Sequence, residues 1–160
     1  MPTTPSLKAR ALRLLAQREH SRHELRRKLL RQPLGGDDGN SAAVAPDDVD
    51  RLLDALEQQG WLSDDRFAAV RTQARAARFG HRRIRDELAR HGIELDADTD
   101  ASLRASELER ARTVWARKYG QPPADAAERA RQMRFLAGRG FAHDVVRRAV
   151  PLPAADPADD

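Results

Sequence analysis

Apolar residues recur at helical spacing along almost the whole chain, and this periodicity limits the possible folds more than any other feature. Val49, Leu52, Leu53 and Leu56, for example, lie at positions i, i+3, i+4 and i+7 and therefore share one face of a helix. No segment shows the alternation of apolar and polar residues that marks a half-buried strand. The pattern predicts an all-α fold.

Nine helical segments can be recognised, and glycines separate several of them. Their expected starts include Ser6, Ser63 and the capping box formed by Ser21 and Glu24. A glycine just beyond the last apolar turn is typical of a helix C-terminus, where the backbone often needs a positive φ angle. Five glycines occupy such positions: Gly60, Gly80, Gly92, Gly120 and Gly140.

An internal repeat groups the nine segments into threes. When Leu29, Leu88 and Leu136 are superposed, their surroundings also match, and Leu25 falls on Ile84. The two spacings are 59 and 48 residues, and the first becomes 47 once twelve inserted residues are set aside. We expect three tandem three-helix repeats in an elongated, curved array. The expected units are residues 1–62 with a flexible insertion at 35–46, residues 63–106 and residues 107–150, followed by a disordered tail at 151–160.

Aromatic residues make up only 4% of the chain, so nearly every one is expected to anchor a local core. Trp61 and Phe67 are expected to pack in a core or between units. In the segment that follows Ser63, the expected buried face consists of Phe67, Val70, Ala74 and Ala77. The other expected anchors are Trp115, Tyr119, Phe135 and Phe141.

Charge alternates in bands along the chain, although the net charge is only +4. The positive bands admit nucleic acid as a partner. A protein that only bound phosphates would have little use for the negative bands, which could pair with the basic helices, favour helix N-termini or meet a basic partner. The net charges are +7 for residues 7–32, −8 for 37–65, +6 for 66–93, −5 for 94–109, +7 for 110–150 and −3 for 151–160.

Arginines form rows on several helical segments. Arg71, Arg75 and Arg78 recur at i, i+4 and i+7, beside the expected apolar face. Such rows suit phosphates or an acidic protein surface, although a solvated helix surface is the simpler interpretation of any single arginine. The candidate binding residues are Arg71, Arg75, Arg78, Arg82, Arg83, Arg90, Arg27 and Arg31.

Several classes of function have no support in the sequence. The chain has no cysteine, and no carboxylate or cysteine cluster completes a metal site around His20 and His23. Asp64 and Asp65 are interpreted as residues that favour a helix start. No phosphate-binding loop, dinucleotide fingerprint or catalytic triad signature is present. We therefore expect no catalytic residues, no cofactor and no metal, in a soluble cytoplasmic protein without a membrane partner.

Four stretches, in order, resemble the RecX family, the modulators of the RecA recombinase. Together they span most of residues 7–150, which makes the combined likeness far more specific than any one motif. The second is similar to the family's pattern G-[YW]-L-x-D-x-[RK]-[FY]-A. The stretches are A-x-x-L-L-x-x-R-x-x-S-R-x-E-L-x-x-K-L at 11–29, GWLSDDRFA at 60–68, R-R-I-x-x-E-L-x-x-x-G-I at 82–93 and R-F-L-x-x-R-G-F at 134–141.

The resemblance implies a regulatory protein of DNA recombination and repair that is not an enzyme. It would lie along or cap the RecA–DNA filament and inhibit ATP hydrolysis, strand exchange and filament extension. The implied partners are the RecA filament and single-stranded DNA, with double-stranded DNA as a further possibility, and the protein is expected to be a monomer. Phe79 departs from the family pattern, because a small or basic residue is expected there.

Other classes of protein are also compatible with the sequence. A helix-turn-helix protein would bind duplex DNA with sequence specificity and without a recombinase. A helical-repeat scaffold of the HEAT kind would bind protein regardless of DNA. A nuclease is the least favoured class, since the basic helices supply few converging carboxylates.

Overall fold

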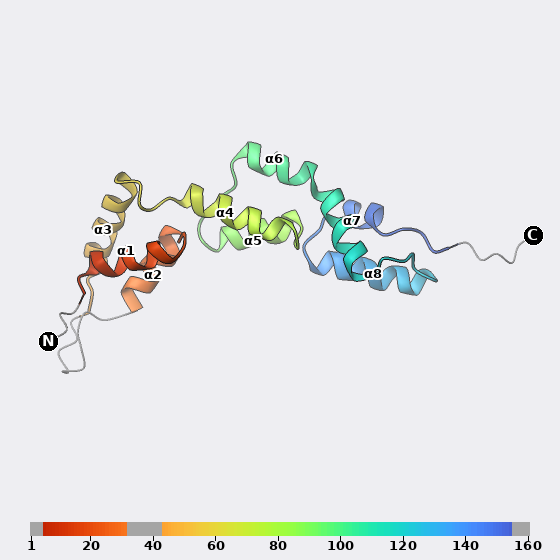
Figure 1. The fold of residues 1–160 in the computed structure, drawn as a ribbon, viewed down its shortest axis with the longest axis horizontal. Coiled ribbons are helices and arrows are strands. Elements are labelled where there is room, and N and C mark those ends of the chain that lie inside the picture. The colour runs from red at the N-terminus through yellow and green to blue at the C-terminus, as the bar shows by residue number, and fades with distance from the viewer. Residues whose placement is uncertain (1–4, 32–42, 155–160) are drawn as a thin grey trace, which may run out of the picture. The chain divides into compact units, whose positions relative to one another are not determined.

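The computed structural model describes residues 5–31 and 43–154, and within these ranges the chain forms nine α-helices and no strand (Figure 1). The predicted all-α class is confirmed. The expected flexible insertion falls outside the described residues over 35–42, as does the expected disordered tail over 155–160. The helices are α1 Leu7–Gln17, α2 Arg22–Arg31, α3 Pro46–Gln58, α4 Asp64–Ala76, α5 His81–Ala89, α6 Ala97–Ala105, α7 Glu107–Lys118, α8 Ala126–Gly138 and α9 His143–Ala149.

The chain divides into two compact units, and the boundary falls within α4. The first unit contains the described residues up to Val70 together with His91–Ile93, and the second contains Arg71–Arg90 and the described residues from Glu94 onward. Among the described residues, no helix is both long and apolar enough to cross a membrane.

Short polar side chains start the helices largely as predicted. The hydroxyl of Ser6 accepts a hydrogen bond from the backbone N–H of Ala9 at 3.2 Å, and that of Ser63 accepts one from Arg66 at 3.2 Å. Ser21 accepts from the N–H of Glu24 at 3.0 Å, which is half of the expected capping box. The carboxylate of Glu24 does not complete the box, since it binds the guanidinium of Arg18 at 2.5 Å.

The predicted glycine helix ends are confirmed at four positions and wrong at the fifth. Gly60, Gly92, Gly120 and Gly140 have φ angles of 76°, 70°, 68° and 85°. Gly80 has a φ angle of −76° and caps the start of α5, whereas α4 already ends at Ala76. Gly80 is therefore needed for a reason other than a left-handed backbone.

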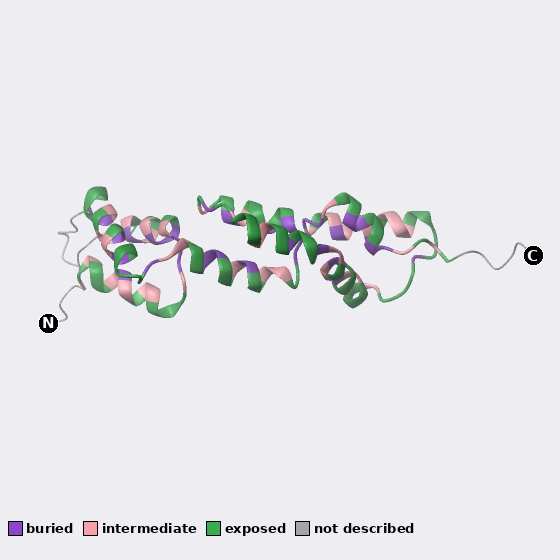
Figure 2. Cartoon of the chain, turned by 90° about the horizontal axis from the view of Figure 1, so that it is seen from above, coloured by how far each residue is buried: buried purple, intermediate pink, exposed green. Residues whose placement is uncertain are grey.

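The core of the first unit lies among α1, α2 and α3 (Figure 2). Leu25 and Leu29 of α2 are fully buried there, and Val49, Leu53 and Leu56 supply the facing side of α3. Val44 lies within the predicted insertion, but it is buried in this core, and Pro46 already begins α3. The linker therefore ends earlier in the chain than the sequence predicts.

Trp61 contradicts the prediction that it packs in a core, because 58% of its surface is exposed. Leu62 takes the buried place instead. After Gly60 the chain turns so that the N–H groups of both Trp61 and Leu62 point to the carbonyl oxygen of Leu56. The second of these two residues faces inward, and the first faces solvent.

The predicted apolar face of α4 is also largely wrong. Phe67 is buried as expected, but Val70 is 56% exposed, and Ala74 and Ala77 are exposed. Alanine buries too little apolar area to hold a helix face against a core. In this part of α4, Thr72 is buried instead.

The main core of the second unit lies among α7, α8 and α9. Leu136 and Phe141 are its large buried members. Leu29, Leu88 and Leu136, the three leucines that the repeat superposes, are all fully buried. Trp115 is half-buried, and its indole N–H donates to the side-chain oxygen of Gln132 at 2.8 Å.

Candidate functional site

Four arginines gather around the ring of Phe79 in the second unit. The guanidinium carbon of Arg83 lies 4.2 Å from the ring centroid, and those of Arg75, Arg139 and Arg78 lie at 5.6, 5.6 and 5.8 Å. Cations within about 6 Å of an aromatic ring are attracted by its electron-rich face. We call these five residues the Phe79 arginine cluster. Phe79 itself is buried, and the four guanidinium groups lie around its ring.

Two glycine turns hold the cluster together through backbone contact. The N–H of Gly80 donates to the carbonyl oxygen of Arg139 at 2.9 Å, and the N–H of Arg82 donates to that of Gly140 at 3.2 Å. A Cβ atom on Gly80 would overlap the backbone nitrogen of Phe141. This close approach is the reason for the glycine at position 80.

A buried glutamate and a half-buried arginine support the same turns. The carboxylate oxygen Oε1 of Glu107 accepts hydrogen bonds from the N–H groups of His81 and Ala142, both at 3.1 Å. The guanidinium of Arg110 donates to the carbonyl oxygens of Phe79 at 2.7 Å and Ala76 at 2.9 Å. Burial lowers the pKa of Arg110. These bonds fix the chain on both sides of the Phe79 ring.

Glu87 binds two of the predicted arginines. Its carboxylate pairs with Arg71 at 2.9 Å and with Arg75 at 3.2 Å, and both arginine side chains are only about one third exposed. Arg78, the third member of the predicted row, is exposed. The row is therefore not uniform, since its first two members are engaged by a carboxylate of α5.

The other predicted binding residues are spread over both units. Arg82 is exposed, and its guanidinium donates to the carbonyl oxygen of Ala137 at 3.3 Å. Arg90 is exposed directly after α5. Arg27 and Arg31 are exposed on α2 of the first unit and do not belong to the cluster.

The sequence prediction missed Phe79 and Arg139 as candidate site residues. Arg139 lies in the R-F-L-x-x-R-G-F motif, directly before Gly140, but nothing in the chain's periodicity shows that this turn meets the turn at Gly80. The signal for Phe79 was its departure from the expected small or basic residue.

Part of the acidic band pairs internally within the first unit. Arg22 of α2 pairs with Asp54 and with Glu57 of α3, both at 2.8 Å. Arg26 pairs with Asp50 at 2.7 Å. These carboxylates hold α3 to α2, as one of the interpretations of the band supposed.

The described residues contain no group of three or more histidine, cysteine or acidic residues that could hold a metal ion. His81 is buried and pairs with Asp100 at 2.6 Å. Hydrogen bonds from Arg104 and His81 lower the pKa of Asp100 to about 2.

Comparison with known proteins places this architecture in one family. The family model described as the third three-helix domain of RecX matches residues 105–150. The regulatory protein RecX of Leptothrix cholodnii is 52% identical over 149 residues, which is 92% of this chain and 88% of that protein. The regulatory protein RecX of Herbaspirillum seropedicae is 48% identical over 162 residues, covering 99% of both chains.

A solved structure shares the fold at much lower identity. The crystal structure of RecX from Lactobacillus salivarius matches with a TM-score of 0.65 and 18% identity, covering 89% of this chain and 91% of that one. The sequence motifs, the helical fold and near-complete coverage at about 50% identity agree, and the chain accordingly belongs to the RecX family of regulatory proteins.

Proposed function

We propose that this protein binds the filament that a RecA-type recombinase forms on DNA and inhibits ATP hydrolysis, strand exchange and filament extension. It acts by binding, as a monomer, and catalyses no reaction itself. Membership of the RecX family supports the regulatory role. The observation that carries the proposal for binding is the Phe79 arginine cluster.

The cluster has the chemistry of an anion-binding surface. Arginine presents planar donors that match a phosphate or carboxylate with two parallel hydrogen bonds. Arg78 and Arg83 are exposed, so their donors can reach a partner while their guanidinium groups rest near the Phe79 ring. Arg71 and Arg75 keep Glu87 neutralised beside them. DNA phosphates of the filament are the partner that this surface fits.

We also propose that the chain is built of three consecutive three-helix units, over residues 1–62, 63–106 and 107–150. The match of residues 105–150 to a three-helix family domain supports the last of them. The repeated burial of Leu29, Leu88 and Leu136 supports a common pattern in all three.

The test is recombinase ATPase on single-stranded DNA with increasing amounts of this protein. Arg78→Gln combined with Arg83→Gln should require about tenfold more protein for half inhibition, because about 1.4 kcal/mol of binding is lost with two charge-assisted contacts. Arg147→Gln combined with Arg148→Gln is the matched control, since it removes two exposed cations from α9 of the same unit.

The possible outcomes distinguish a failure of the cluster's proposed role from a failure of the proposed function. Inhibition at the normal concentration by a folded Arg78→Gln, Arg83→Gln protein would refute the role of the cluster. Absence of inhibition by the unaltered protein would refute the function itself. Tight, sequence-specific binding to duplex DNA without recombinase would favour the helix-turn-helix alternative.

A further inference from the structure

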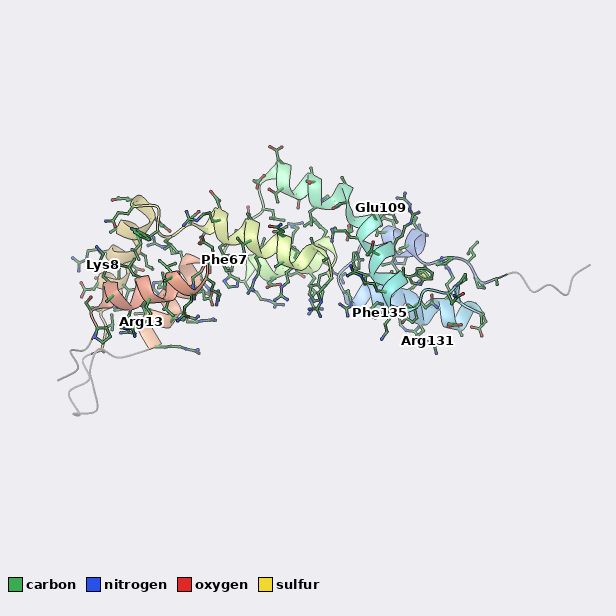
Figure 3. All side chains as sticks on the ribbon, in the orientation of Figure 1. Lys8, Arg13, Phe67, Glu109, Arg131 and Phe135 are labelled. Atoms are coloured by element: carbon green, nitrogen blue, oxygen red, sulfur yellow. The ribbon has the colours of Figure 1, made fainter. Side chains whose placement is uncertain are left out.

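A small cavity of about 250 Å³ lies beside the Phe79 arginine cluster, in the second unit. Phe135 of α8 forms part of its wall, next to α7 (Figure 3). Its lining combines apolar side chains with cations and includes no carboxylate. The lining residues are Ala77, Arg78, Val114, Arg117, Lys118, Phe135 and Arg139.

The aromatic wall of the cavity is held in place by its neighbours. Tyr119 packs edge to face against Phe135, with the ring centroids 5.6 Å apart and the planes at 89°. The guanidinium carbon of Arg139 lies 4.9 Å from the Phe135 centroid, and Nζ of Lys118 lies 5.4 Å from it. Phe135 is only half-buried, so the cavity offers an accessible aromatic surface with two cations beside it.

The rim carries charge of one sign. Arg78, Arg117 and Lys118 are exposed and none of the three has an ion pair among the described residues, whereas many other arginines of the chain do. A group of uncompensated cations around an apolar wall selects a ligand that is both anionic and able to fill an apolar space.

We propose that this cavity binds one nucleotide of single-stranded DNA, with the base against Phe135 and the flanking phosphates at Arg78, Arg117 and Lys118. Aromatic side chains within a positively charged groove are the general means by which proteins bind single strands. A duplex cannot offer its bases in this way, because they are paired and stacked inside the helix. An acidic peptide would satisfy the cations but lacks a planar group that matches the aromatic wall.

Arg139 connects this subsite to the Phe79 arginine cluster. Its guanidinium carbon lies 5.6 Å from the Phe79 centroid as well as 4.9 Å from that of Phe135, and one of its nitrogens donates to the carbonyl oxygen of Arg78 at 3.4 Å. A strand that placed a base in the cavity would therefore bring its next phosphates to the cluster. The inference rests on the proposed function and specifies which form of DNA the second unit takes.

The experiment measures binding of the full chain to a fluorescein-labelled oligothymidylate, without recombinase, by fluorescence anisotropy over a series of salt concentrations. An abasic strand with the same number of phosphates is measured in parallel. Phe135→Leu should weaken oligothymidylate binding about 5- to 100-fold through lost stacking and leave abasic binding within about twofold.

The cationic rim is tested by a matched pair of double variants. Arg117→Gln with Lys118→Gln should reduce the steepness of log affinity against log salt by about 1.4, since each phosphate contact on a single strand contributes about 0.7. Arg147→Gln with Arg148→Gln removes two cations from the last turn of α9, just as the first pair does from α7, and should change the slope by less than half as much.

A readout that does not depend on variants completes the test. Ultraviolet irradiation of the unaltered protein with oligothymidylate, followed by mass spectrometry, should find a crosslinked nucleotide on the α8 peptide at Phe135. Thermal unfolding confirms that Phe135→Leu remains folded.

Three results would overturn the proposal. The first is equal affinity for the abasic and thymidylate strands together with no crosslink at Phe135. The second is an equal loss of salt dependence in the two double variants. The third is unchanged strand binding by Arg117→Gln, Lys118→Gln with loss of binding to DNA-free recombinase, which would assign the cavity to an acidic protein surface. Recombinase inhibition is measured separately, so failure of the subsite and failure of the proposed function are distinguishable.

Discussion

At the scale of single residues, Gly80 and Gly140 are both confined by close backbone, and only Gly140 also has a positive φ angle. Gly140 needs a positive φ angle, and helix periodicity predicts that need. Gly80 has an ordinary φ angle and is confined by the backbone of Gly140 and Phe141. One sequence cannot reveal a spatial constraint imposed by a turn 60 positions away.

Gly80→Ala should destabilise the second unit by about 1–3 kcal/mol, because its Cβ atom would collide with backbone that cannot move aside like a side chain. Gly138→Ala is the matched control: its Cβ atom would meet nothing within 4 Å, and a helical alanine gains about 0.5 kcal/mol. Urea unfolding followed by Trp115 fluorescence in a Trp61→Phe background measures both. Equal stability of the two variants would show that the turns do not touch as described.

Glu107 provides a second prediction at this scale. Glu107→Ala leaves the buried N–H group of His81 and the part-buried N–H group of Ala142 without their acceptor and should cost about 3 kcal/mol of unfolding free energy. Glu107→Gln keeps an oxygen at the same place and should cost less than half as much. Urea unfolding measures the free energy of unfolding of both variants. An equal decrease in the two would mean that the negative charge of Glu107 matters more than its hydrogen bonds.

At the scale of elements, helix existence was predictable and helix environment was not. Ser6 and Ser63 start their helices through hydrogen bonds to residues three positions away, so the sequence alone predicts these helix starts. The buried face of α4 depends on which neighbours are available, and α4 crosses from one compact unit into the other. A single apolar periodicity cannot describe a helix whose two halves belong to different compact units.

The junction between α1 and α2 should make the first unit sensitive to acid. Burial alone would raise the pKa of Glu24, but the hydrogen bonds and charge of Arg18 outweigh it and lower the pKa from 4.5 to about 2. A carboxylate with a lowered folded-state pKa stabilises the protein above pH 4.5 and loses that contribution as pH falls from 4.5 toward 2.

We expect Glu24→Gln to lose at most about 3 kcal/mol of unfolding free energy at pH 7 and much less at pH 3. Urea unfolding at pH 7, 5 and 3, followed by circular dichroism, compares it with the unaltered protein. A constant difference across these pH values would show that the effect is packing and not ionisation.

At the scale of the whole molecule, the charged bands have two roles that the net charge of each band does not show. Carboxylates of α3 pair with Arg22 and Arg26 of α2 inside the first unit. In the second unit, only some of the cations near Phe79 and Phe135 have a carboxylate partner. Glu87 pairs with Arg71 and Arg75. The bands themselves were visible in the sequence, whereas the sorting of charges into paired and uncompensated sets required the fold.

Neutralising the two carboxylates that pair with Arg22 should therefore free this arginine to bind a phosphate. Asp54→Asn with Glu57→Gln changes the net charge from +4 to +6, and should steepen the salt dependence of single-strand binding by about 0.7 as Arg22 gains a phosphate contact. Asp47→Asn with Asp65→Asn gives the same net charge from two exposed carboxylates that have no ion pair among the described residues. Identical slopes for the two proteins would show that only total charge counts.

Arg139 lies near two aromatic rings at once, in a chain with only seven aromatic residues. A guanidinium that lies near two rings and donates to the carbonyl oxygen of Arg78 has less rotamer freedom than a fully solvated one. Ordering a long side chain at an interface costs about 0.5–1.5 kcal/mol, so a phosphate bound at the proposed subsite would meet a cation that has incurred part of this entropy loss during folding. The two rings thereby restrict the rotamers of Arg139, while the side chain keeps its full length and its charge.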